Sequence, residues 1–212
     1  MTRRDTKSLI CEVARELFNL QGTANVSTNH VALELDMSPG NLYYHFRNKE
    51  AILDRLLAQY LGELKPYTNS NALESDIEDA WFFIHMTSEL ATRYRFIYRD
   101  TDYILGKYPP AAQAVSLALT SLLEAITRLL TGLDKNGALQ LPSDQAHRDL
   151  AMNMLIVCTQ WIRFRRHLAG KAQVDVEAED LNAGVYQTLS IVMPYLEPSQ
   201  RQHLENLRGQ YT

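Results

Sequence analysis

The chain has 212 residues, of which 46% are hydrophobic and 22% charged, so it can bury a core as one large or two small domains. Its formal net charge of −4 excludes nucleic-acid binding through overall positive charge, although the basic residues Arg3, Arg4 and Lys7 lie at the start of the chain. No signal peptide opens the chain and no apolar run approaches the ~20 residues that span a bilayer. A soluble, cytoplasmic protein without membrane contact is therefore expected. Cys11 and Cys158 fall in apolar helical patterns and are expected to be buried thiols of a reducing compartment.

Three short helices are predicted in the first part of the chain. Apolar residues at helical spacing predict the first over residues 6–21, and Gly22 ends it. Ser27 is expected to cap the second, because its hydroxyl can accept one of the free amide protons of a new helix. Ser38 is expected to cap the third, with Pro39 at the first helical position, where its missing N–H costs nothing.

The third of these helices presents polar and aromatic side chains outward. Leu42 and Phe46 lie four residues apart and are expected to face the core. Its flanks and outer face then hold Asn41, Tyr43, Tyr44 and His45. Two short helices with a tight turn, of which the second carries such groups, form a helix-turn-helix whose second helix enters the major groove of DNA. Asn41 suits a bidentate pair with adenine, Lys49 suits a phosphate oxygen, and Gly40 lets the backbone approach DNA.

These residues resemble a known family. SerProGly at 38–40, LeuTyrTyrHisPhe at 42–46 and AsnLysGlu at 48–50 are similar to the DNA-binding segment of TetR-type bacterial repressors. The similarity in residue type and spacing runs from about Leu9 to Leu53. The candidate DNA contacts that follow from the motif and the resemblance are Ser27, Thr28, Asn29, Ser38, Pro39, Gly40, Asn41, Tyr43, Tyr44, His45 and Lys49.

The rest of the chain is expected to be helical as well, because strand signals are absent throughout. The fold class is therefore all-α. The resemblance implies an N-terminal three-helix DNA-binding domain over residues 1–48 and a larger helical domain for ligand sensing and dimerisation over 67–212. A linker helix over 49–66 is expected to end at Pro66. Further helices are predicted from Glu74 and over 111–130, 144–169 and 176–195, followed by a short polar helix.

Aromatic and polar side chains gather in residues 81–108 and recur on the helix that Ser143 is expected to cap. Such a set is typical of a small-molecule pocket, and equally of a helical core with an ion pair at its rim, such as Arg99 with Asp102. The resemblance favours the pocket. The candidate ligand-binding residues are Trp81, Phe82, His85, Arg95, Tyr98, Arg99 and Trp161.

Two helices, 144–168 and 177–196, carry more apolar surface than one domain needs to bury. The resemblance implies that each meets its twin in a four-helix interface, which makes the protein a homodimer. A dimer would also place two recognition helices on the half-sites of a palindromic operator, about 34–36 Å apart.

The leading functional hypothesis is a DNA-binding transcriptional regulator, a homodimeric repressor whose operator affinity is released by a small-molecule ligand. One alternative is a DNA-binding helical protein without a ligand, constitutive or architectural. Another is a helical interaction protein that does not bind DNA. The sequence has no Gly-rich phosphate loop, no Cys/His metal spacing and no nucleophile elbow. No enzyme activity, catalytic residue, metal ligand or cofactor is therefore predicted.

Overall fold

The computed structural model describes residues 5–69, 76–170 and 178–210. Within these ranges the chain is helical and has no strand, so the all-α prediction is confirmed. The chain folds into two compact units, each with its own core, and the units are described separately below. The first unit comprises residues 1–63 and 94–117, and the second comprises residues 64–93 and 118–212.

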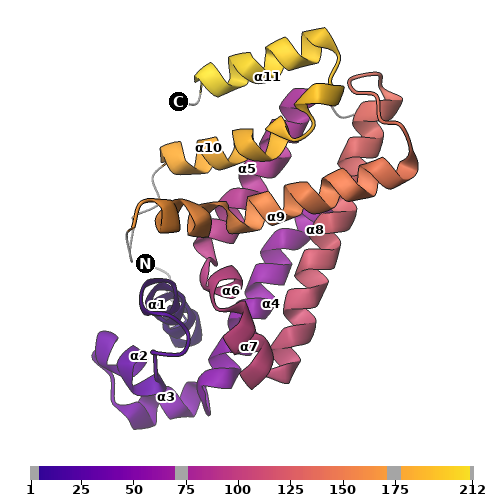
Figure 1. Cartoon of the computed structure of the whole chain (residues 1–212). Coiled ribbons are helices and arrows are strands. Elements are labelled where there is room, and N and C mark those ends of the chain that lie inside the picture. Colours follow the sequence, from indigo (N-terminus) through magenta and orange to yellow (C-terminus); the bar gives the residue numbers. More distant parts are fainter. Residues whose placement is uncertain (1–4, 70–75, 171–177, 211–212) are drawn as a thin grey trace. The chain divides into compact units, whose positions relative to one another are not determined.

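The first unit joins the three N-terminal helices to two short helices from much later in the chain. Helix α1 packs against α2, α3 and α6, and α6 packs against α7 (Figure 1). Its core is built from residues at helical spacing, among them Ile10, Phe18, Val31, Leu42 and Leu53, each at most 1% exposed. Its elements are α1 (Thr6–Gln21), α2 (Thr28–Glu34), α3 (Pro39–His45), the first part of α4 (Lys49–Thr68), α6 (Phe96–Arg99), α7 (Thr101–Lys107) and the start of α8 (Pro109–Lys135).

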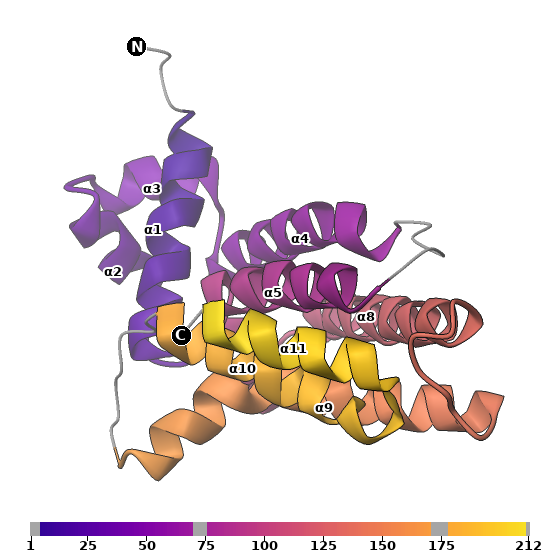
Figure 2. The ribbon, with the colours of Figure 1, turned by 90° about the horizontal axis from the view of Figure 1, so that it is seen from above.

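The second unit is a layered bundle. Helix α5 packs against α9, α10 and α11, and α10 lies between α9 and α11 (Figures 1 and 2). Met154 of α9 and Val185 and Leu189 of α10 are completely buried. The elements that begin in this unit are α5 (Ile77–Arg93), α9 (Asp144–Leu168), α10 (Ala178–Ser190), the 3₁₀ helix η1 (Met193–Tyr195) and α11 (Pro198–Gln210).

Several predicted helix ends are shifted. Pro66 lies inside α4 rather than ending it, and the Thr68 hydroxyl donates to the carbonyls of Leu64 and Lys65 in the last turn. The proline lacks the N–H that would bond the carbonyl four residues earlier, and the helix ends two residues after it. Helix α8 continues to Lys135, five residues beyond the predicted end.

The helix predicted over 176–195 is instead two elements, α10 and η1. Pro194 is the second residue of η1, and a residue without an N–H cannot continue the α-helical hydrogen bonds. Residues 176 and 177 lie outside the described ranges, as do the basic residues Arg3 and Arg4.

Helix α8 is long and apolar enough, by length and composition, to cross a membrane, with a mean hydropathy of 1.4 over an 18-residue window. No run of that kind was expected from the sequence. One such helix is weak evidence for a membrane protein, because a core helix of a soluble protein meets the same criteria. Val115, Leu122, Ile126, Leu130 and Leu133 of α8 are buried by the protein itself.

Candidate nucleic-acid interface

The helix-turn-helix begins each of its helices with a side-chain cap. The Ser27 hydroxyl accepts from the His30 amide, and His30 Nδ1 accepts from the Ser27 amide, which makes a reciprocal capping box. The Ser38 hydroxyl accepts from the Asn41 amide at the start of α3. Asp36, in the turn between the two helices, has a φ of 49°. A polar side chain such as aspartate tolerates this left-handed conformation better than most.

Helix α3 exposes the side chains that the sequence predicted to face DNA. Leu42 is fully buried, whereas Tyr44 is 85% exposed and Asn41 is also exposed. The Tyr43 hydroxyl lies 3.3 Å from the Thr28 hydroxyl, so α3 meets the start of α2 through an exposed polar contact. Tyr44 and His45 stack edge to face, with ring centroids 5.2 Å apart.

Lys49, a predicted phosphate contact, is hydrogen-bonded to backbone carbonyls of the first unit. Its ammonium group donates to the carbonyls of Thr23, at 2.5 Å, and Val26, at 2.9 Å. It also lies 5.6 Å from the centroid of the Tyr103 ring. Lys49 therefore fastens the turn before α2, and its contact with phosphate remains a prediction. Arg47, two residues earlier, is exposed.

The seven candidate ligand-binding residues divide between the two units. Arg95, Tyr98 and Arg99 belong to the first unit, where the Tyr98 and Tyr60 hydroxyls are hydrogen-bonded. Arg99 pairs with Asp100, at 2.7 Å, and not with the Asp102 that its spacing suggested. Asp100 was not predicted as a partner from the sequence.

The other four belong to the second unit, where Trp81 is buried and Phe82 is 63% exposed. Trp161 Nε1 donates to the carbonyl of Asp180 at 2.9 Å. His85 Nδ1 is buried and has no hydrogen-bond partner among the residues that the structure describes.

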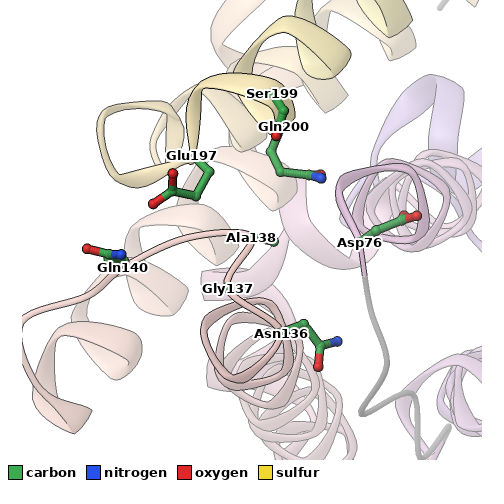
Figure 3. A pocket seen from close by; sticks show the side chains of 8 residues that line it. All are labelled: Asp76, Asn136, Gly137, Ala138, Gln140, Glu197, Ser199 and Gln200. Carbon is green, nitrogen blue, oxygen red and sulfur yellow. The ribbon is translucent and has the colours of Figure 1, made fainter.

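A cavity of about 460 Å³ lies in the second unit, and none of the predicted ligand residues lines it. Figure 3 shows that its side chains do not converge on one point, and the Asp76 carboxylate already caps α5 by accepting from the amides of Glu78 and Asp79. Within the described ranges no group of three potential metal ligands occurs. The cavity is lined by Asp76, Asn136, Gly137, Ala138, Gln140, Glu197, Ser199 and Gln200.

Comparison with known families agrees with this geometry. Residues 10–56 match the family model described as "Bacterial regulatory proteins, tetR family". Residues 50–204 match a second model, TetR, described as "Bacterial transcriptional repressor", which covers well over half of the chain. The chain belongs to the TetR family. It is thus a member of a family of DNA-binding transcriptional regulators, and its helix-turn-helix is the DNA-binding element of that family.

Individual relatives support the same assignment. A crystal structure of a TetR-family transcriptional regulator from Marinobacter aquaeolei superposes with a TM-score of 0.86 and 31% identity over 98% of each chain. A gamma-butyrolactone receptor shares the TetR fold, with a TM-score of 0.72 and 14% identity over 97% of this chain and 96% of its own. An HTH-type transcriptional regulator of Staphylococcus aureus is 39% identical over 46 residues, or 22% of this chain. That match spans only a quarter of the Staphylococcus protein.

Proposed function

We propose that this TetR-family chain is a homodimeric repressor that reads a palindromic operator with helix α3. The observation that carries the proposal is the outer face of α3, where Asn41, Tyr43 and Tyr44 are exposed on a helix held by a cap and a buried Leu42. A bidentate Asn–adenine pair would supply specificity, and hydroxyls and backbone amides at the starts of α2 and α3 would position the phosphates. The full set of proposed DNA contacts is the one predicted from the sequence.

Selection of DNA from a random pool by the purified protein tests this function. We expect enrichment of an inverted repeat with half-sites about one helical turn apart, bound with an affinity that falls as salt rises. A folded protein that enriches no sequence, before and after refolding from denaturant to remove any bound small molecule, would contradict DNA recognition. It would favour the helical interaction protein instead.

The dimer is proposed to form through α9 and the segment 178–196. Large apolar side chains of α9 recur at multiples of four residues and remain exposed in the single chain: Met152, Ile156, Phe164 and Leu168. An apolar band of this length is unusual on a monomer and is typical of a protein interface. Tyr195 of η1, in the second proposed segment, is also an exposed large apolar residue.

The mass of the protein in solution tests whether the exposed face of α9 is a dimer interface or a solvent-exposed helix face. Ile156 is 53% exposed, and Ile156→Glu is expected to convert the dimer to a monomer because a charge would enter the centre of the interface. Leu117 of α8 is 57% exposed, so Leu117→Glu is the matched control and is expected to leave the dimer intact. If sedimentation gives the same mass for both variants, α9 is not the interface.

A small-molecule effector is proposed to bind in the second unit, with His85 as its polar anchor. A buried nitrogen without a partner is costly, and a ligand donor or acceptor would satisfy His85 Nδ1. Trp81, which is buried four residues before it, would supply apolar contact. The structural relative named a gamma-butyrolactone receptor is, by its name, a receptor for a small molecule.

Screening small apolar compounds for release of the selected operator tests the effector. We expect any active compound to lose potency in His85→Phe, which keeps an aromatic ring and removes both ring nitrogens, while operator affinity without the compound is unchanged. A compound that is equally potent on His85→Phe would exclude His85 as the anchor. If no compound releases DNA or raises the melting temperature, the DNA-binding protein without a ligand is favoured.

A further inference from the structure

The turn that joins α1 to α2 is fastened by an arginine from far along the chain. Arg99 Nη1 donates to the carbonyl of Asn19 at 2.7 Å, and Nη2 donates to the carbonyl of Phe18 at 2.5 Å. Both carbonyls lie in the last turn of α1, at the negative end of the helix dipole, and the Phe18 carbonyl also accepts from the Gly22 amide. The guanidinium group thus acts as a side-chain cap on the C-terminus of α1.

Asp100 completes this arrangement. Its carboxylate accepts from Arg99 Nε at 2.7 Å and from Nη2 at 2.9 Å, so the two side chains form a bidentate pair. The same carboxylate accepts from the backbone amide of Thr23 at 2.6 Å. The Arg99 and Asp100 side chains are only 25% and 14% exposed, which limits competition from water. Asp100 therefore fixes the arginine and also holds the turn itself.

Two further contacts hold the same turn. The Asn19 side chain accepts from the Phe96 amide at 3.0 Å, at the start of α6. Lys49 donates to the Thr23 carbonyl, so both backbone polar groups of Thr23 are held by charged side chains. Ser27, the cap of α2, follows four residues later. The geometry of this turn consequently sets the direction in which α2 leaves α1.

From these contacts we propose that Arg99 and Asp100 are positioning residues for DNA recognition: they hold the turn between α1 and α2 in the geometry that lets α3 fit its operator. The proposal rests on the proposed function, in which α3 reads DNA. It predicts an effect on specific binding, because base contacts depend on the orientation of α3, whereas non-specific binding depends mainly on charge.

The two side chains carry opposite charges, which makes the test selective. Removal of a positive charge by Arg99→Gln lowers affinity for every DNA, and removal of a negative charge by Asp100→Asn raises it. A positioning role instead predicts that both variants have a lower ratio of operator affinity to non-specific affinity than wild type. Asp102→Asn, which alters an exposed carboxylate two residues away, is the matched control for Asp100→Asn.

The experiment measures the affinity of wild type and variants for the selected operator and for a scrambled duplex at one salt concentration. Circular dichroism at the same temperature establishes that each variant is folded. We expect the ratio to fall about tenfold in Arg99→Gln and in Asp100→Asn, and to stay at the wild-type value in Asp102→Asn. Arg99→Lys keeps the positive charge but not the planar set of donors of the guanidinium group. The ratio is therefore expected to fall in this variant as well.

Folded Arg99→Gln, Asp100→Asn and Arg99→Lys proteins with wild-type ratios would overturn the positioning role. If all three variants are unfolded, the pair is a stability element only and the proposal is likewise wrong. A wild-type protein that selects no operator would instead refute the proposed function, so the two failures are distinguishable.

Discussion

Gly184 in α10 provides the sharpest test of how the second unit is packed. A Cβ atom added at this position would lie 2.5 Å from Cδ1 of Trp161 and 3.1 Å from its Cγ and Nε1. Carbon atoms in contact are normally about 3.5–4 Å apart. Trp161 cannot move freely, because its Nε1 donates to the carbonyl of Asp180, which belongs to the same helix as Gly184. Gly184→Ala therefore has to separate α9 from α10 or displace the indole ring.

The expected size of the effect follows from three contributions. Alanine stabilises a helix interior by about 0.8–1 kcal/mol relative to glycine. Overpacking of a close contact costs about 1–3 kcal/mol, and loss of the Trp161 hydrogen bond costs about 0.5–1.5 kcal/mol more. The steric contributions outweigh the helix propensity. Gly184→Ala is therefore expected to lower the free energy of unfolding by about 1–3 kcal/mol.

Urea unfolding followed by circular dichroism measures this change. Gly62→Ala in α4 is the control, because a Cβ at that position would meet no atom within 4 Å. The control is expected to raise the free energy of unfolding by up to about 1 kcal/mol through helix propensity alone. If Gly184→Ala is as stable as wild type, or gains as much as the control, the proposed packing of Trp161 on Gly184 is wrong.

Three further outcomes are expected. Asn41→Ala should weaken operator binding by about 1–3 kcal/mol, and an unchanged ratio of specific to non-specific affinity would exclude base recognition by Asn41. Lys49→Ala should lower the free energy of unfolding by about 1–3 kcal/mol, because two carbonyls lose a charged donor. If the variant is instead as stable as wild type, and the slope of log binding constant against log salt concentration is flatter by about 1, the result would support the phosphate contact. Burial alone would raise the pKa of Asp100, but hydrogen bonds from Arg99 and the Thr23 amide outweigh it and hold the pKa below its ordinary value. The ionised carboxylate thus stabilises the fold above pH ~4 and loses this effect as the pH falls below that. The stability difference between wild type and Asp100→Asn, from urea unfolding at pH ~3–6, should shrink toward acid, and a constant difference would contradict the linkage.

The helix-turn-helix was predictable from sequence because its determinants are local. The caps at Ser27 and Ser38, the inward Leu42 and the turn at Asp36 all act within about four residues along the chain, where helical geometry fixes which groups meet. The same is true of α9, whose start at Ser143 and end near residue 168 were predicted closely. The outward face of α3 follows from the same local geometry, so the candidate DNA surface was predictable with it.

Long-range partners were decided by the tertiary structure. Thr23 and Asp100 are separated by 77 residues, and neither residue carries a periodic or capping signal that connects them. Spacing alone suggested Asp102 as the partner of Arg99, whereas packing of α6 against α1 brings Arg99 and Asp100 to the turn after α1. The close contact between Gly184 and Trp161 likewise has no signature in the sequence. Sequence periodicity thus determined which residues are helical and which face is apolar, while only packing between distant helices determined which polar groups meet.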